Sequence, residues 1–186
     1  GAKEGIIKGH YLCKASEKKN ARLHAQLFGS GAILNKVIAA QKILEEQYQV
    51  AADVWSVTSY KELHQDALRT ERWNMFHPEE KARVPYVAQA LKGAKGVFVA
   101  ASDYVKALPE SISKWLPGPL ISLGTDGFGR SDGRKQLRDF FEVDERYITL
   151  ATLYGLAREE KLKPEVVKKA IRDLDIDPEK ADPMIS

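Results

Sequence analysis

Stretches that are apolar throughout mark the strands of a predicted sheet. Residues 97–101 form an uninterrupted apolar run, as expected for a strand that is buried on both faces of a parallel sheet. Residues 53–58 are rich in β-branched and aromatic side chains, which favour strands. Residues 119–123 are a further apolar run that predicts a buried strand.

Between these strands, apolar residues recur at the spacing of helices. The stretches with this spacing are residues 33–44, 60–75, 104–115 with a bend at Pro109, 148–157 and 164–174. Asp144 is placed to cap the helix that follows it, and Pro164 suits the first turn of the last helix. Strands that alternate with helices predict a mostly parallel sheet with helices on both faces.

The start of the chain departs from this alternation. Residues 5–15 are expected to be extended, residues 16–20 have the composition of a turn, and residues 21–28 alternate between apolar and polar positions. The two extended segments are predicted to pair as a hairpin, which would give the sheet one antiparallel edge strand.

The predicted architecture is an α/β fold of three layers. We expect about five strands, mostly parallel, with one antiparallel edge strand and helices on both faces. Residues 1–186 are expected to form a single domain, and residues 143–186 a helical tail packed on it.

Charge and composition exclude several classes of protein. The chain carries Lys+Arg 29 against Asp+Glu 26, a net charge of +3, which does not favour nucleic-acid binding. It lacks an apolar stretch of the ~20 residues that a membrane span needs, and its first residues lack a signal-peptide pattern. Cys13 is the single cysteine, so no internal disulfide is possible and a cytoplasmic location is expected. Because the sequence starts with Gly1 and not methionine, we expect it to be cut from a longer chain or to carry a cloning remnant.

The most unusual stretch is residues 123–132, which we call the 123–132 loop. It follows a predicted strand and precedes a helical pattern, and Ser131 or Asp132 is predicted to cap that helix. Loops at the carboxyl ends of strands gather contacts with ligands and partners. Two interpretations stay open: a loop stiffened by its aspartates and an arginine–carboxylate pair, or a contact surface for a partner. The residues on which the second interpretation depends are Asp126, Phe128, Arg130 and Asp132.

A second candidate surface lies at the end of the helix predicted over residues 60–75. Arg72 and Trp73 are typical anchors of protein interfaces, although Trp73 would also suit a hydrophobic core. Pro78 is expected to end this helix near His77.

Residues that could carry catalysis are poorly placed in the sequence. The histidines at 10, 24, 64 and 77 include no pair at metal-binding spacing. The glycine turn at 29–31 has Leu34 where a dinucleotide site needs glycine, and Ser30 lacks the pattern of a nucleophile elbow. We therefore predict no catalytic, cofactor-binding or metal-binding residue in this chain.

Several motifs in one order resemble a known family. They are EGIIKG at 4–9, SVTS at 56–59, ERWNM at 71–75 with HP at 77–78, RVPY at 83–86 and LGTDGFGRSD at 123–132. Together they resemble the C-terminal, transketolase-C-terminal-like domain of the homodimeric bacterial-type pyruvate dehydrogenase component. The resemblance spans residues 4–185.

This resemblance implies a parent enzyme that uses thiamine diphosphate and magnesium. Such an enzyme decarboxylates pyruvate and passes the acetyl group to the lipoyl group of dihydrolipoyl acetyltransferase. The thiamine signature of the family is only partly echoed by residues 125–127, so no catalytic residue is carried over and no cofactor is expected on this fragment. The chain is expected to support dimerisation and partner docking. The alternative is a regulatory module that binds a small molecule at the turn of residues 29–31 or in the loop of residues 126–132.

Overall fold

A sheet of five strands, in the order β1-β3-β2-β4-β5, organises the molecule. The computed structural model describes residues 2–18 and 20–185. The strands are β1 (His10–Lys14), β2 (Leu23–Gly29), β3 (Val50–Val57), β4 (Val97–Ala101) and β5 (Leu120–Leu123). β1 runs antiparallel to β3, and the other neighbouring strands are parallel. The predicted α/β sheet with one antiparallel edge strand is therefore confirmed.

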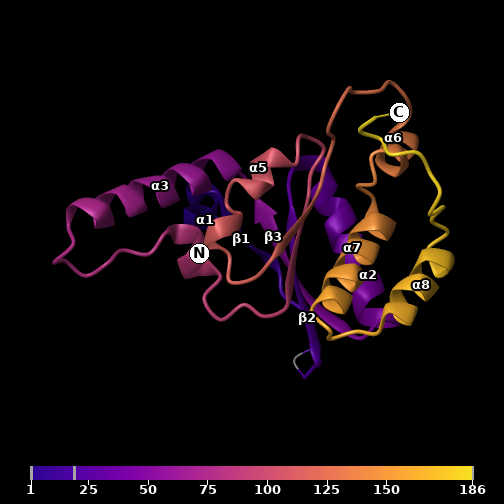
Figure 1. Ribbon diagram of the computed structural model, residues 1–186, viewed down its shortest axis with the longest axis horizontal. Coiled ribbons are helices and arrows are strands. Elements are labelled where there is room, and N and C mark those ends of the chain that lie inside the picture. Colours follow the sequence, from indigo (N-terminus) through magenta and orange to yellow (C-terminus); the bar gives the residue numbers. More distant parts are fainter. Residues whose placement is uncertain (1, 19, 186) are drawn as a thin grey trace.

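Helices cover both faces of this sheet and give three layers (Figure 1). The face that carries Leu27 is covered by α2 (Leu34–Gln47), α7 (Glu145–Arg158) and α8 (Pro164–Asp173). The face that carries Phe28 is covered by α3 (Tyr60–Phe76) and α4 (Tyr86–Ala90). The shorter elements are α1 (Ala2–Lys8), η1 (Gly31–Ile33), α5 (Ala107–Glu110), η2 (Ser113–Trp115) and α6 (Arg134–Phe140).

The two faces of the sheet bury separate hydrophobic clusters. Successive residues of a strand point to opposite faces, so Leu27 joins the cluster under α2 and α7 while Phe28 joins the cluster under α3. Every residue of β4 is buried. Fully burying one large apolar side chain contributes roughly 1.5–3 kcal/mol, so these clusters supply most of the stabilisation of the fold.

The predicted hairpin at the start of the chain is wrong. β1 pairs with β3, with His10 opposite Val57, and residues 5–8 belong to helix α1. The reason is that β2 is buried from Ala25 to Gly29 and takes β3 and β4 as parallel neighbours on its two sides. The more exposed β1 is left with the outer edge of β3.

Three local predictions also need correction. β5 is half-buried, because it is the other edge strand of the sheet. Residues 104–115 form only the short helices α5 and η2, since Pro109 lies inside the first of them. Helix α6 has Gly133 at its N-cap, and the Asp132 carboxylate instead accepts a hydrogen bond from the Gly133 N–H at 2.6 Å.

Other boundaries follow the sequence. Asp144 caps α7 by accepting hydrogen bonds from the backbone N–H groups of Arg146 and Tyr147, as predicted. Pro164 is the first residue of α8. Helix α3 ends at Phe76, one residue before His77 and two before Pro78. Within the described residues, no helix has both the length and the apolar character needed to cross a membrane.

Candidate functional site

The 123–132 loop leaves the carboxyl edge of the sheet and is fastened at its beginning. The Asp126 carboxylate accepts a hydrogen bond from the Lys106 backbone N–H at 3.0 Å and pairs with the Lys106 ammonium at 3.2 Å. The Thr125 N–H donates to the Tyr104 carbonyl at 2.9 Å. Gly127 has a φ of +77°, a conformation that side chains other than glycine rarely adopt. Asp126 therefore holds the loop in place.

Beyond Gly127, the loop presents its side chains outward. The Phe128 side chain is 89% exposed, the highest value among the exposed large hydrophobic residues described. The Arg130 guanidinium lies 5.5 Å from the centre of the Phe140 ring, and Asp132 is exposed. Large exposed aromatic residues beside arginine are typical of protein interfaces. This part of the loop has the chemistry of a contact surface.

The end of α3 carries the second predicted surface. The Trp73 ring stacks on the His77 ring with 4.3 Å between the ring centres, and the Arg83 guanidinium lies 3.6 Å from the centre of the Trp73 ring. The Asn74 side chain binds both the N–H and the C=O of Arg83. Trp73 is therefore held by the segment that folds back after α3.

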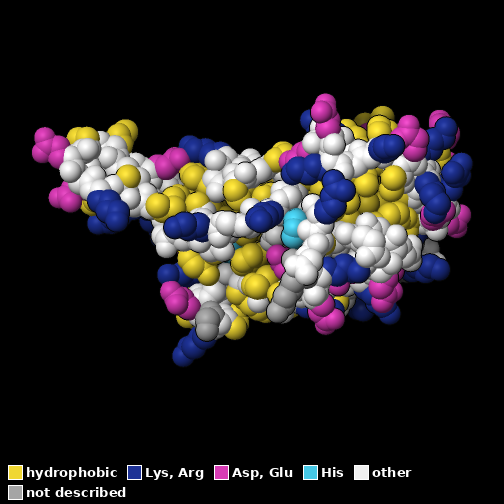
Figure 2. Space-filling view, turned by 90° about the horizontal axis from the view of Figure 1, so that it is seen from below, with side chains coloured by type: hydrophobic (Ala, Val, Ile, Leu, Met, Phe, Trp, Pro, Cys, Tyr) yellow, Lys and Arg dark blue, Asp and Glu magenta, His cyan; other side chains and the backbone are white. Residues whose placement is uncertain are grey.

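This clamp leaves an apolar tip in solvent. Met75 and Phe76 are 68% and 59% exposed, and the Arg72 guanidinium lies 4.7 Å from the centre of the Phe76 ring. In Figure 2 the projecting end of the molecule carries hydrophobic side chains beside Lys and Arg. Arg72 and Trp73 are thus brought together with an exposed apolar group that the sequence-based prediction did not include.

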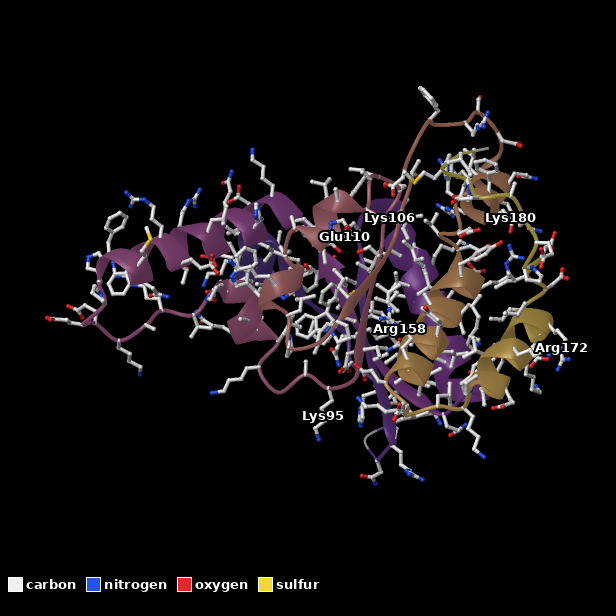
Figure 3. The ribbon with its side chains drawn as sticks, viewed as in Figure 1. Lys95, Lys106, Glu110, Arg158, Arg172 and Lys180 are labelled. Carbon is white, nitrogen blue, oxygen red and sulfur yellow. The ribbon has the colours of Figure 1, made fainter. Side chains whose placement is uncertain are left out.

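The structure does not bring the two candidate surfaces together. The end of α3 and the 123–132 loop lie toward opposite ends of the long axis of the molecule (Figure 1). Lys106, which fastens the loop, lies on the same side of α5 as the loop in Figure 3. The chain therefore offers two separate surfaces rather than one convergent site.

The turn at residues 29–31 has a packing role. A Cβ added at Gly29 would lie 2.9 Å from the Leu34 Cα, so glycine lets α2 approach the end of β2 closely. Leu34 occupies the place that a dinucleotide motif gives to glycine. The close approach of α2 explains the glycine without any ligand.

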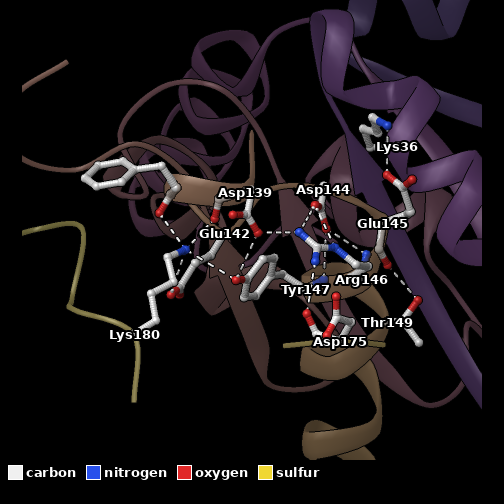
Figure 4. Close-up of polar contacts among 11 residues, drawn as sticks. Lys36, Asp139, Glu142, Asp144, Glu145, Arg146, Tyr147, Thr149, Asp175 and Lys180 are labelled. Atoms are coloured by element: carbon white, nitrogen blue, oxygen red, sulfur yellow. Dashed lines mark hydrogen bonds and ion pairs between the residues drawn. The ribbon is translucent and has the colours of Figure 1, made fainter. Parts of the chain in front are cut away.

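A polar network that was not predicted from the sequence ties α6, α7 and the C-terminal segment together (Figure 4). Arg146 bridges Asp144 and Asp139, and the Lys180 ammonium binds the Asp139 and Phe140 carbonyls. Hydrogen bonding to Asp144 raises the pKa of the Arg146 guanidinium, and burial raises the pKa of the Tyr147 hydroxyl. The charged groups of this network are paired with groups of the protein itself, which is typical of a network that stabilises the fold.

Titratable side chains do not converge on a reactive centre in the described part of the chain. Residues 2–18 and 20–185 contain no group of three or more His, Cys, Asp or Glu side chains that could hold a metal ion. His10 is buried against Phe28, Trp55 and Tyr86, and burial lowers its pKa to about 4. Cys13 is exposed on β1.

Comparison with known proteins identifies a domain family and a set of curated relatives that are similar to this chain. Residues 9–144 match the family model of the transketolase-like TK C-terminal domain. The Pyruvate dehydrogenase E1 component of Pseudomonas aeruginosa is 49% identical over 185 residues, which cover 99% of this chain and 21% of that protein. The protein of the same name from Escherichia coli is 44% identical over 187 residues, covering 100% of this chain and 21% of that protein. The chain thus spans about a fifth of the length of these curated relatives.

Solved structures give the same fold at low sequence identity. A transketolase from Leishmania mexicana aligns with a TM-score of 0.52 at 18% identity and covers 83% of this chain and 19% of that one. A transketolase mutant from Pichia stipitis aligns with a TM-score of 0.55 at 14% identity and covers 86% of this chain and 19% of that one. These likenesses establish the arrangement of strands and helices.

Proposed function

The chain belongs to the family of transketolase-like C-terminal domains, and from this premise we propose that it is the C-terminal domain of a cytoplasmic, thiamine-diphosphate-dependent pyruvate dehydrogenase. The observation that carries the proposal is the high identity to the pyruvate dehydrogenase relatives along essentially the whole chain. The parent enzyme would decarboxylate pyruvate and acetylate the lipoyl group of dihydrolipoyl acetyltransferase.

The residues of this chain do not fit the thiamine diphosphate and magnesium that the parent enzyme would use. Asp126 is the carboxylate of the partial thiamine motif at 125–127, and it is engaged by both the backbone and the ammonium of Lys106. Magnesium prefers several oxygen ligands in one place, and the described residues supply no cluster of that kind. The proposal therefore assigns the cofactor and the chemistry to the remainder of the polypeptide.

The role that we propose for this chain is to support the dimer and to dock the acetyltransferase. Arg72 and Trp73 would act at the end of α3, and the loop would act through Asp126, Phe128, Arg130 and Asp132. Because Lys106 fastens the loop and Arg83 clamps Trp73, little ordering entropy would be lost when a partner binds. The residue types exposed at both ends suit an interface.

Variants of the full-length polypeptide test this role. Phe128→Ser and Arg72→Ala change exposed side chains, so the thermal unfolding midpoint should move by no more than about 2 °C. We expect at least one of them to weaken dimerisation or acetyltransferase binding by about tenfold, measured by analytical ultracentrifugation and surface plasmon resonance. Tyr154→Ser, at another exposed aromatic residue, is the matched control and should leave both associations unchanged. If both associations survive both variants, the proposed role is contradicted.

A further inference from the structure

The order of the strands creates a crevice at the carboxyl edge of the sheet. From β2 the chain continues to β3 on one side through α2, and from β3 it returns to β4 on the other side of β2 through α3. Helix α2, which follows β2, packs on the face of Leu27, whereas Ile112 in the segment after β4 packs on the face of Phe28, so the segments that follow β2 and β4 diverge. In open α/β sheets, ligands bind at such a point of divergence.

A cavity of about 420 Å³ opens at this point of the fold. Its walls come from the segments that follow three parallel strands: Ala32 after β2, Asp103 after β4 and Thr125 after β5. Helix α6 and the residues after it close the remaining side. The volume lies in the range of sites for small organic ligands.

One wall of this crevice is strongly cationic. Arg130, Arg134 and Arg138 line it, and the last two are one helical turn apart on the same face of α6. No acidic group in residues 2–18 and 20–185 forms an ion pair with Arg134 or Arg138. Like charges at this spacing oppose helix formation, and an anion between them would remove that cost.

The other surfaces of the crevice are of two kinds. Ile33, Leu137, Phe141 and Val143 give it an apolar wall. Asp103 and Thr125 belong to the lining as well, and a carboxylate and a hydroxyl are groups that accept hydrogen bonds from ligand hydroxyl groups. The lining therefore combines anion binding, an apolar surface and hydrogen-bond acceptors.

We propose that this crevice binds a nucleoside phosphate. Arg134 and Arg138 hold the phosphate groups, the apolar wall carries the base, and Asp103 and Thr125 receive the sugar hydroxyls. The proposal involves no chemical reaction at any residue of the chain, so the crevice is proposed as a binding site only. The proposal goes beyond the function proposed above, and either of the two can fail while the other stands.

Isothermal titration calorimetry of the 186-residue chain with ADP, in the absence of magnesium, tests this site. Pyrophosphate and adenosine are the comparison ligands, because each carries only part of the proposed chemistry. We expect saturable binding of ADP that is at least about tenfold tighter than binding of either part. Arg134→Ala and Arg138→Ala should each weaken ADP binding by about tenfold.

Arg172→Ala is the matched control, because Arg172 lies on α8 far from the crevice (Figure 3) and carries the same charge. Thermal unfolding of each variant shows whether the chain is folded, and amide chemical shifts should move at Thr125 and Gly129 when ADP binds. Three results would each overturn the proposal: no saturable ADP binding at millimolar concentration, ADP affinity unchanged in both crevice variants, or pyrophosphate binding as tightly as ADP.

Discussion

At the scale of single residues, His10 shows how burial sets the chemistry of this chain. Its side chain is almost wholly buried, and neither ring nitrogen has a hydrogen-bond partner among the described residues. Charging such a ring is costly, so burial lowers its pKa to about 4 from an ordinary value of 6.5. The histidine is therefore neutral over the physiological range and contributes as a core side chain.

This makes stability depend on pH in a defined direction. The unfolded chain protonates His10 as the pH falls through 6.5, whereas the folded chain does so only near pH 4, so acid favours unfolding. We expect this residue to remove up to about 3 kcal/mol of unfolding free energy between pH 7 and pH 4. Urea unfolding at several pH values measures it. His10→Leu should flatten the dependence and the control His64→Gln should not; equal slopes in all three proteins would contradict the expectation.

Gly96 gives a second prediction at the residue scale. Its φ is +86°, and an added Cβ would lie 1.8 Å from the His24 carbonyl oxygen. Gly93 has a φ of +83°, but its Cβ would meet no atom within 4 Å. We expect Gly93→Ala to cost about 1–2 kcal/mol of unfolding free energy through backbone strain alone. Gly96→Ala should cost clearly more, because the clash with backbone adds to the strain. Similar losses in urea unfolding would show that the close contact is unimportant.

At the scale of elements, local chemistry predicted the central strands and failed at the edges. β4 is apolar at each position and β3 is mostly apolar, so the sequence alone indicates strands buried on both faces there, whereas β2, with His24 and Gln26, was predicted only as an extended segment with the wrong partner. The partner of β1 could not be read from its own residues, because it depends on which strand has a free edge after the parallel core has formed. The same limit applies to β5, whose apolar run lies at the other edge.

Contacts between residues that lie far apart in the sequence could not be predicted from it either. The contact of Lys180 with the Asp139 carbonyl joins positions 41 residues apart, so no local pattern indicates it. The cationic wall of the crevice was missed for a different reason. Arg134 and Arg138 at helical spacing are typical of a solvated helix face, and only the folded chain places them beside Ile33 and Thr125.

The caps of α6 and α7 give a prediction at this scale. Asp144 accepts two backbone hydrogen bonds at the start of α7 and also pairs with Arg146, whereas Asp132 precedes the N-cap residue of α6. We therefore expect Asp144→Ala to lower the unfolding free energy by about 1–2 kcal/mol. Asp132→Ala, an equal change at a residue that does not cap, should lower it by less than about 0.5 kcal/mol. Chemical unfolding of the two variants compares them directly, and a larger loss at Asp132 would refute this assignment of the caps.

At the scale of the whole molecule, the fold separates the two candidate surfaces. The apolar tip of α3 and the exposed part of the 123–132 loop lie toward opposite ends of the long axis (Figure 1), and the sheet joins them. Such an arrangement suits a domain that connects other parts of a larger assembly. In the function proposed above, the catalytic chemistry belongs to the remainder of the polypeptide.

Calorimetric titration of thiamine diphosphate with magnesium tests this central claim most directly. The 186-residue chain should be used with Arg134→Ala and Arg138→Ala introduced, so that the crevice cannot contribute, and the full-length polypeptide should be titrated beside it. We expect saturable binding and pyruvate decarboxylation by the full-length polypeptide, and neither of them by the 186-residue chain. Saturable binding of the cofactor to that chain, or pyruvate turnover by it alone, would contradict the account.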